Sequence, residues 1–105
     1  MSLWPVLHLW TMLWKTPDQQ AMMALKQQHY ETAAAQFINP DWKAAAFYRA
    51  GHYQQAATLY KAHASLENTY NLGNALAHLK RYREALAAYQ KVLAAQPQHA
   101  DALAN

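Results

Sequence analysis

The sequence lacks cysteine altogether and has only two glycines among its 105 residues. Without cysteine the chain can form no disulfide, has no thiol nucleophile and offers no thiolate to a zinc ion. Two glycines are too few for a hairpin-rich β architecture, whose tight turns repeatedly need positive φ. Alanine, the strongest helix former, is instead the commonest residue type. The composition therefore predicts one small all-α domain.

Charged residues are also few, and six acidic against nine basic side chains give a net charge of +3 at pH 7. The basic residues are spread along the chain, with one concentration at Lys80, Arg81 and Arg83. Binding to nucleic acid depends on many phosphate contacts acting together, so we interpret this concentration as a solvated turn between helices. We expect no nucleic-acid partner.

No group of residues has a spacing that is typical of catalysis or of a bound metal. The acidic residues fall at expected helix starts, where they complement the helix dipole. Neither Ser2 nor Ser65 lies in a Gly-x-Ser-x-Gly elbow. The histidines include no pair at the i, i+4 spacing of a helical zinc site. We expect a non-enzymatic protein with no metal and no cofactor.

The most apolar stretch of the chain, residues 3–14, contains three tryptophans. As a helix it rises about 18 Å, well short of a bilayer core of about 30 Å. Leu3, Leu7, Trp10 and Trp14 share one helical stripe. We predict an extra apolar helix within residues 1–15 that packs on the domain or on a second copy. The alternative is a position beside a membrane, because tryptophan concentrates where hydrocarbon meets water.

A short pattern, Tyr-x-x-Ala-x-x-x-aromatic, occurs three times and begins at Tyr30, Tyr53 and Tyr82. In a helix these positions share one face, so the alanine allows close approach of a neighbouring helix between two rings. Each copy follows a short break in the helical pattern, which predicts the second helix of a helix–turn–helix pair. The copies supply six residues that we expect in the core: Tyr30, Phe37, Tyr53, Tyr60, Tyr82 and Tyr89.

Start signals for the first helix of each pair lie between these copies. Thr16 and Gln19 form a capping box, Asn39 precedes the Pro40 that opens the next helix, and Ser65 can cap the third. Residues 16–105 are therefore expected to form helix pairs over about 16–38, 39–64 and 66–99, with another helix starting at 100–105. An apolar front end and an unfinished helix at the back lead us to expect part of a longer protein.

The third pair resembles a tetratricopeptide repeat. Residues 66–99 span the about 34 residues of that repeat. They carry its small and aromatic positions in order, at Asn71, Leu72, Gly73, Asn74, Ala75, Tyr82, Ala85, Tyr89 and Pro97. Thr69 stands where the family has a tryptophan. The resemblance implies an α-α superhelix of helix–turn–helix pairs, made irregular by the shorter spacing of the first two copies.

A narrower resemblance covers nearly the whole chain. Residues 13–20, 37–42 and 48–53 are similar to a bacterial family, the Bat-type proteins named for aerotolerance, which join a von Willebrand factor A domain to tetratricopeptide repeats. In that family the repeats follow a membrane helix. The resemblance therefore implies a domain associated with the bacterial inner membrane, on a side that the sequence leaves open, with membrane contact only through the parent protein.

The tetratricopeptide resemblance also implies a concave groove, lined by the first helices, that holds a peptide or a helix. Carried over by position, the groove would use Asn71, Asn74, Tyr70, His78, Arg49 and Tyr48. An asparagine amide both donates and accepts, so it can bind a peptide backbone. Arg49 can bind a carboxylate through two parallel hydrogen bonds. The alternative for Asn71 and Asn74 is that they belong to the structural consensus of the repeat.

We therefore expect a non-enzymatic scaffold that binds a peptide or helix of a protein partner. The alternative is a self-association module, in which the apolar N-terminal helix packs into a groove of the same or another copy. Exposed apolar area of that kind rarely stays unpaired.

Overall fold

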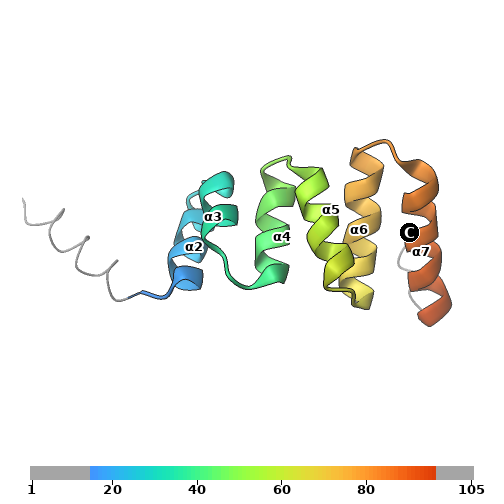
Figure 1. Ribbon diagram of the computed structural model, residues 1–105, viewed down its shortest axis with the longest axis horizontal. Helices are drawn as coiled ribbons and strands as arrows, with labels where there is room; N and C mark the ends of the chain where they lie inside the picture. The colour runs from blue at the N-terminus through green and yellow to red at the C-terminus, as the bar shows by residue number, and fades with distance from the viewer. Residues whose placement is uncertain (1–14, 97–105) are drawn as a thin grey trace, which may run out of the picture.

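The computed structural model describes residues 15–96. This part of the chain is a row of six helices with no strand, paired in chain order (Figure 1). The helices are α2 (Pro17–Lys26), α3 (Tyr30–Gln36), α4 (Pro40–Arg49), α5 (Tyr53–Ala62), α6 (Leu66–His78) and α7 (Tyr82–Ala95). The predicted all-α fold of irregular tetratricopeptide pairs is confirmed. The predicted helices within residues 3–14 and 100–105 lie outside the described residues.

Side chains cap the first helix of each pair, as predicted. Thr16 Oγ1 accepts a 3.1 Å hydrogen bond from Gln19 N, and the Gln19 side chain accepts a 2.9 Å bond from Thr16 N. Asn39 Oδ1 accepts from the first turn of α4, and Ser65 Oγ accepts from Asn68 N at the start of α6. These oxygens satisfy backbone donors that the helices themselves cannot pair.

The same turn closes all three pairs. Gln28, Gly51 and Lys80 have φ of 63°, 82° and 62°. After each of them, the next backbone N–H bonds back to the preceding helix, as from His52 to the Phe47 carbonyl at 2.9 Å. This is the hydrogen bonding of a Schellman motif, in which one left-handed residue ends the helix. The second helices consequently begin at the predicted tyrosines.

Shorter helices account for the irregular spacing of the repeat. Helix α3 has 7 residues, whereas α7 has 14. Pro40 restricts Asn39 to an extended conformation, so α3 must end before it. The segment between α3 and α4 is bound to α2, because the Asp18 carboxylate accepts hydrogen bonds from Ile38 N at 2.6 Å and from Asn39 N at 3.3 Å.

A lysine holds the carbonyl end of α3. Lys43 Nζ, from α4, donates to the Ala34 carbonyl at 2.5 Å and to the Phe37 carbonyl at 3.4 Å. The same ammonium lies 5.6 Å from the centre of the Phe47 ring. A cation at this position complements the negative end of the helix dipole and pairs carbonyls that the short helix leaves open.

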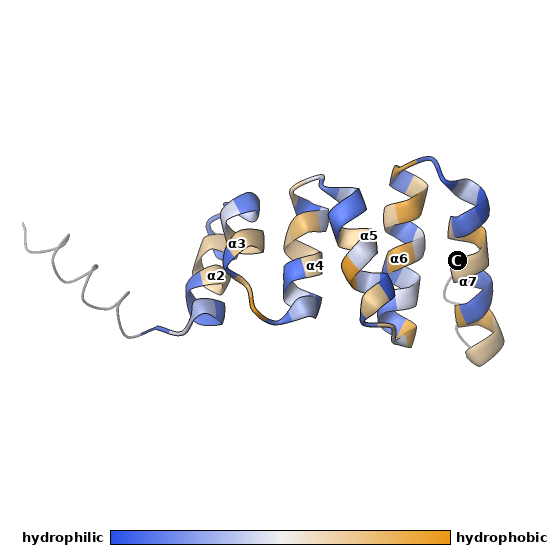
Figure 2. Cartoon of the chain, in the orientation of Figure 1, coloured by the Kyte–Doolittle hydropathy of each residue, from blue (hydrophilic) through white to orange (hydrophobic). Residues whose placement is uncertain are grey.

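The core is built mainly from alanine. Fully buried alanines occur on α2 to α6, where they let neighbouring helices approach closely: Ala21, Ala33, Ala34, Ala44, Ala46, Ala56 and Ala75. The largest fully buried side chain among the described residues is Val92. Hydrophobic positions recur along each helix, with hydrophilic positions between them (Figure 2). The core thus extends along the row of helices.

The expected core aromatics have three different environments. Phe37 and Tyr60 are buried, whereas Tyr30, Tyr53 and Tyr89 are half-buried and pack against the core clusters. The prediction for Tyr82 is wrong, because its side chain is 64% exposed. Tyr30 and Tyr53 open helices that a later pair covers, but no described helix follows α7.

Candidate peptide-binding surface

Three aromatic rings meet where α4, α5 and α6 come together. The Tyr53 ring stacks on the His78 imidazole, with centroids 4.2 Å apart and planes at 7°. Tyr48 packs edge-on against both, at 5.4 Å from His78 and 5.2 Å from Tyr53. The structure therefore brings together two predicted groove residues, Tyr48 and His78, which are distant in sequence.

Helix α6 presents a line of side chains beside these rings. Tyr70, Asn74 and His78 follow one another at intervals of four residues, so they form one face of the helix, which we call the α6 stripe. At the other end of the stripe, the Tyr70 ring lies 5.8 Å from the Tyr89 ring of α7. Asn71 borders the stripe and is partly exposed.

The orientation of Asn74 is set by α7. The Tyr89 hydroxyl donates a 2.6 Å hydrogen bond to Asn74 Oδ1. With its oxygen engaged, Asn74 has its amide N–H groups left to donate, and they have no hydrogen-bond partner within residues 15–96. The Asn71 amide has no partner in that range either. Two partly exposed amides of α6 thus have N–H donors that no residue in the described range accepts.

Burial raises the pKa of two tyrosine hydroxyls near this surface, those of Tyr48 and Tyr89. It raises the pKa of Tyr48, and the neighbouring Tyr53 and Tyr70 raise it further. Burial likewise raises the pKa of Tyr89, with further contributions from Tyr70 and Tyr48. The surface is polar and aromatic.

Arg49, the remaining predicted groove residue, lines a different hollow. It lies at the end of α4, exposed, opposite Glu31 and Thr32 of the first pair. It has no ion-pair partner within residues 15–96. The structure therefore groups Arg49 with the α2–α3 turn, in a hollow that no residue of the α6 stripe lines.

The histidines do not gather into a metal site in the part of the chain that the structure describes. His52, at the start of α5, instead lies 2.9 Å from Glu31 Oε1 of α3 and joins the first two pairs. His29 and His63 are exposed. No helix among residues 15–96 has the length and apolar character needed to cross a membrane.

Tyr53 and Tyr89 belong to this surface, although their positions in the repeated pattern predicted core. Both rings pack against a core cluster, and each also contacts a predicted groove residue: Tyr53 contacts His78, and Tyr89 contacts Tyr70. The sequence feature that indicates the position of Tyr89 is Gly73, because a glycine within a helix often marks a place where another part of the chain approaches the helix closely. A Cβ built on Gly73 would lie 2.5 Å from Cε1 of the Tyr89 ring.

Comparison with known protein families agrees with the fold. The family model for the tetratricopeptide repeat matches residues 70–99, which cover most of α6 and all of α7. Neither the curated proteins nor the solved structures give a match to the chain. The chain thus contains a detectable tetratricopeptide repeat within a helical-repeat fold. Such repeats generally mediate protein–protein interaction and are non-catalytic.

Proposed function

We propose that the chain binds an extended peptide or a helix of a protein partner on the face formed by Tyr48 and the α6 stripe, with Asn71. The observation that carries the proposal is the Asn74 amide. Its oxygen is held by Tyr89, and its N–H groups have no partner among residues 15–96. Asn74 is half-buried, and carbonyl groups of a bound backbone can accept from these N–H groups when a ligand displaces water from them.

The rest of the surface supports the same use. The rings of Tyr48 and Tyr70 offer apolar faces with polar rims, which suit peptide side chains of mixed character. Asn71 adds a second amide one residue beyond Tyr70. Arg49 lies outside this surface, in the hollow beside the α2–α3 turn, and its unpaired guanidinium can bind a carboxylate of a ligand that extends that far. Because backbone groups are common to all peptides, these contacts provide affinity and the aromatic contacts provide selectivity.

The test is selection of random peptides displayed on phage against the full chain, followed by affinity measurements on synthetic copies. We expect the paired change Asn71→Ala/Asn74→Ala to lower the affinity for peptides that bind this surface about tenfold or more. Arg49→Ala should lower the affinity for those peptides that carry an acidic residue. Gln55→Ala/Gln90→Ala, which removes two exposed amides from the second helices, is the matched control. Equal affinity for the Asn71→Ala/Asn74→Ala variant and the control would contradict the proposal.

We also propose that the chain is the repeat region of a membrane-tethered bacterial protein of the Bat type. Support comes from the sequence similarity of residues 13–20, 37–42 and 48–53. The test is to read the parent gene on both sides of this segment and to fractionate native cells. A membrane helix and a von Willebrand factor A domain upstream, with the protein in the inner-membrane fraction, are expected. A parent gene without either would refute this assignment.

Self-association is the second candidate, supported by the apolar and tryptophan-rich sequence of residues 3–14. If this segment fills a groove of another copy, its deletion converts an oligomer into a monomer in light scattering. An oligomer of unchanged mass after the deletion would rule this candidate out. Helicity measured by circular dichroism checks that residues 15–96 remain folded.

A further inference from the structure

A second groove lies between α5 and α7, on the opposite side of α6 from the candidate peptide-binding surface. Its floor consists of Thr69, Leu72 and Leu76. Because successive helical residues are about 100° apart, these three side chains lie about half a turn round α6 from the α6 stripe. The two surfaces are therefore separate. We call this hollow, of about 640 Å³, the α5–α7 groove.

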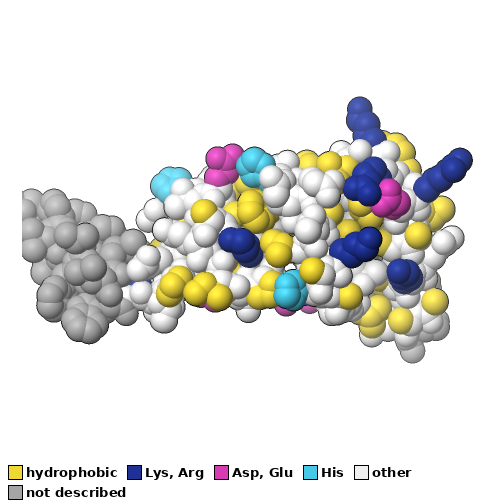
Figure 3. Space-filling view, in the orientation of Figure 1, with side chains coloured by type: hydrophobic (Ala, Val, Ile, Leu, Met, Phe, Trp, Pro, Cys, Tyr) yellow, Lys and Arg dark blue, Asp and Glu magenta, His cyan; other side chains and the backbone are white. Residues whose placement is uncertain are grey.

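The α5–α7 groove has small side chains on both walls and positive charge at its edge. Ala57 lies on the α5 wall and Ala87 and Ala88 on the α7 wall, so small side chains form much of both walls, and Tyr60 of α5 is the one aromatic residue among the lining residues described. Lys61 and Lys91 lie on opposite walls. In the space-filling view, Lys and Arg side chains gather over the α5–α7 end of the molecule, with hydrophobic side chains between them (Figure 3).

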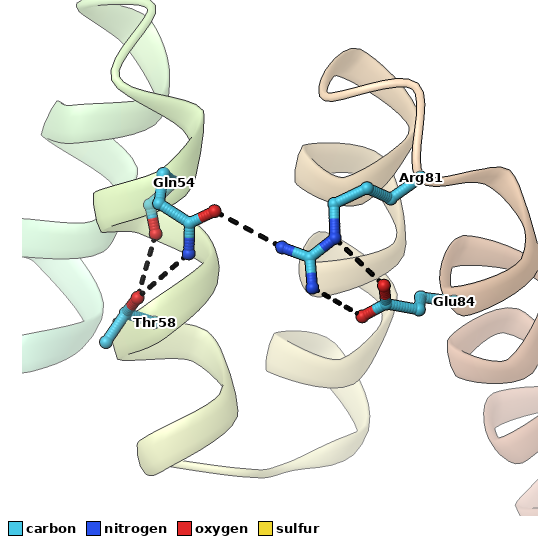
Figure 4. Close-up of polar contacts among 4 residues, drawn as sticks. All are labelled: Gln54, Thr58, Arg81 and Glu84. Carbon is cyan, nitrogen blue, oxygen red and sulfur yellow. Dashed lines mark hydrogen bonds and ion pairs between the residues drawn. The ribbon is translucent and has the colours of Figure 1, made fainter.

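A polar network closes one end of the groove (Figure 4). Arg81, at the start of α7, binds both oxygens of Glu84 at 2.9 and 2.7 Å and donates a 3.2 Å hydrogen bond to Gln54 Oε1 on α5. Thr58 accepts a 3.4 Å bond from the Gln54 amide. The network connects the two walls and pairs the only acidic side chain that lines the groove within residues 15–96.

The other end of the groove has unpaired positive charge. Lys61 lies about 12 Å along α5 from Tyr53, and Lys91 lies about 13 Å along α7 from Tyr82, so both lysines are at the end remote from Arg81. Thr69, in the first turns of α6, is on the floor at this end. Neither lysine has a hydrogen-bond or ion-pair partner within residues 15–96.

The preceding pair shows what fills the corresponding space elsewhere in the chain. Lys43 and Leu72 hold the same position, each the same number of residues before the tyrosine that opens the next helix. Lys43 reaches from α4 across to the last carbonyls of α3, connecting floor to wall. The leucine side chain at position 72 cannot make the corresponding hydrogen bonds to the preceding helix, and Thr69 beside it is small. The α5–α7 groove is therefore open where its counterpart is bridged.

We propose that the α5–α7 groove binds an acidic peptide segment of a protein partner. One bulky apolar side chain of the segment lies on the floor between the alanine walls, and its carboxylates bind Lys61 and Lys91. Charge complementarity selects this occupant, because the two unpaired cations flank a largely apolar floor, and the Glu84 carboxylate on the α7 wall is already paired with Arg81. The groove gives the scaffold a second docking surface, independent of the one formed by the α6 stripe.

Selection of random phage-displayed peptides against the full chain tests this proposal as well. We expect a class of peptides with acidic residues beside a large apolar residue. Their affinity falls about tenfold or more in Lys61→Glu/Lys91→Glu, and also in Thr69→Trp, which fills the floor without changing charge. Lys26→Glu/Arg83→Glu makes the same charge change at exposed positions outside the groove and leaves the affinity unchanged. Circular dichroism verifies that each variant is folded.

A charge swap provides the second measurement. Peptides of this class with their acidic residues changed to lysine should bind Lys61→Glu/Lys91→Glu and not the native chain. The proposal fails if no acidic class is selected, if its affinity survives Thr69→Trp, or if the charge-matched control weakens it equally. It also fails if a single-stranded oligonucleotide competes with the peptides in a manner that depends on Lys61 and Lys91. None of these results depends on Asn71 or Asn74, so the earlier proposal stands or falls separately.

Discussion

The Tyr89 ring lies directly over Gly73, and its hydroxyl donates a 2.6 Å hydrogen bond to Oδ1 of the adjacent Asn74. Two neighbouring residues of α6 thus contact different parts of one tyrosine of α7. Gly73 makes room for the ring, and Asn74 holds its hydroxyl. The packing of the third helix pair and the orientation of a proposed ligand-binding amide are consequently coupled.

Replacing Gly73 by alanine should destabilise the fold. The added Cβ would lie 2.5 Å from a ring carbon, so the Tyr89 ring must move and its bond to Asn74 weakens. We expect a loss of about 1–3 kcal/mol in the free energy of unfolding. Urea unfolding followed by circular dichroism measures it.

The control for this change is the same substitution in a Tyr89→Leu background, where the ring is gone. There the alanine should have little effect or stabilise the helix, since alanine is favoured over glycine by about 1 kcal/mol. Equal losses with and without Tyr89 would show that the two residues are not coupled.

Glycine at position 80 should stabilise the third pair. Lys80 has a φ of 62°, a left-handed conformation that disfavours side chains with a Cβ. Lys80→Gly removes that strain at some expense in chain entropy, so a net gain of about 0.5–1 kcal/mol in unfolding free energy is expected. Differential scanning calorimetry of the variant against the native chain measures the rise in Tm.

The equivalent turn of the second pair supplies the reverse experiment. Gly51 has a φ of 82°, and no atom lies within 4 Å of a Cβ built on it. Gly51→Ala therefore introduces backbone strain without a steric clash, and Tm should fall. A fall for Lys80→Gly, or no change for Gly51→Ala, would mean that these turns relax out of the left-handed conformation.

Much of this fold is local and could be predicted from the sequence. Capping residues such as Thr16, Asn39 and Ser65 act within one turn, so their side chains identify the helix starts directly. The repeated tyrosine pattern likewise places the second helices, because periodicity depends only on neighbouring residues.

Links between pairs were beyond such reasoning. Their sequence positions mark Asp18 and Asp41 as dipole partners of their own helices, yet Asp18 also bonds to the segment between α3 and α4, and Asp41 to the third pair. Asp18 accepts from the backbone of Ile38, and Asp41 accepts a 2.7 Å hydrogen bond from the buried amide of Asn68. Pairwise contacts of this kind depend on how helices cross, which one sequence without an alignment does not specify. Helical spacing predicts that Tyr70, Asn74 and His78 share one face of α6, but it predicts neither the hydrogen bond from Tyr89 to Asn74 nor the separate hollow of Arg49.

Replacing Lys43 by methionine should loosen the first pair. Methionine keeps much of the apolar stem but loses the ammonium that donates to the Ala34 and Phe37 carbonyls. Hydrogen bonds from a charged group contribute about 1.5–3 kcal/mol, so a loss of that order is expected. Hydrogen exchange should show faster exchange of the α3 amides, whereas the α7 amides remain protected. Uniform acceleration along the chain would indicate that Lys43 has no special role at α3.

Alkaline pH should destabilise the protein through three of its tyrosines. Burial raises the pKa of Tyr48, Tyr60 and Tyr89 above 10.0, the value that applies to the unfolded chain. The folded state therefore retains protons that the unfolded state loses, and its stability is complete below pH 10 and falls as pH rises through the folded pKa. Urea midpoints should be level from neutral pH to about pH 9 and decline above pH 10.

The triple change Tyr48→Phe/Tyr60→Phe/Tyr89→Phe separates the tyrosines from the lysines, which titrate in the same range. It removes the three hydroxyls whose pKa is raised, so the decline above pH 10 should become shallower. Absorbance of tyrosinate in the native chain should appear at higher pH than in the urea-unfolded chain. An identical pH dependence of stability for the native chain and the triple variant would show that these hydroxyls have the same pKa in the folded and unfolded states.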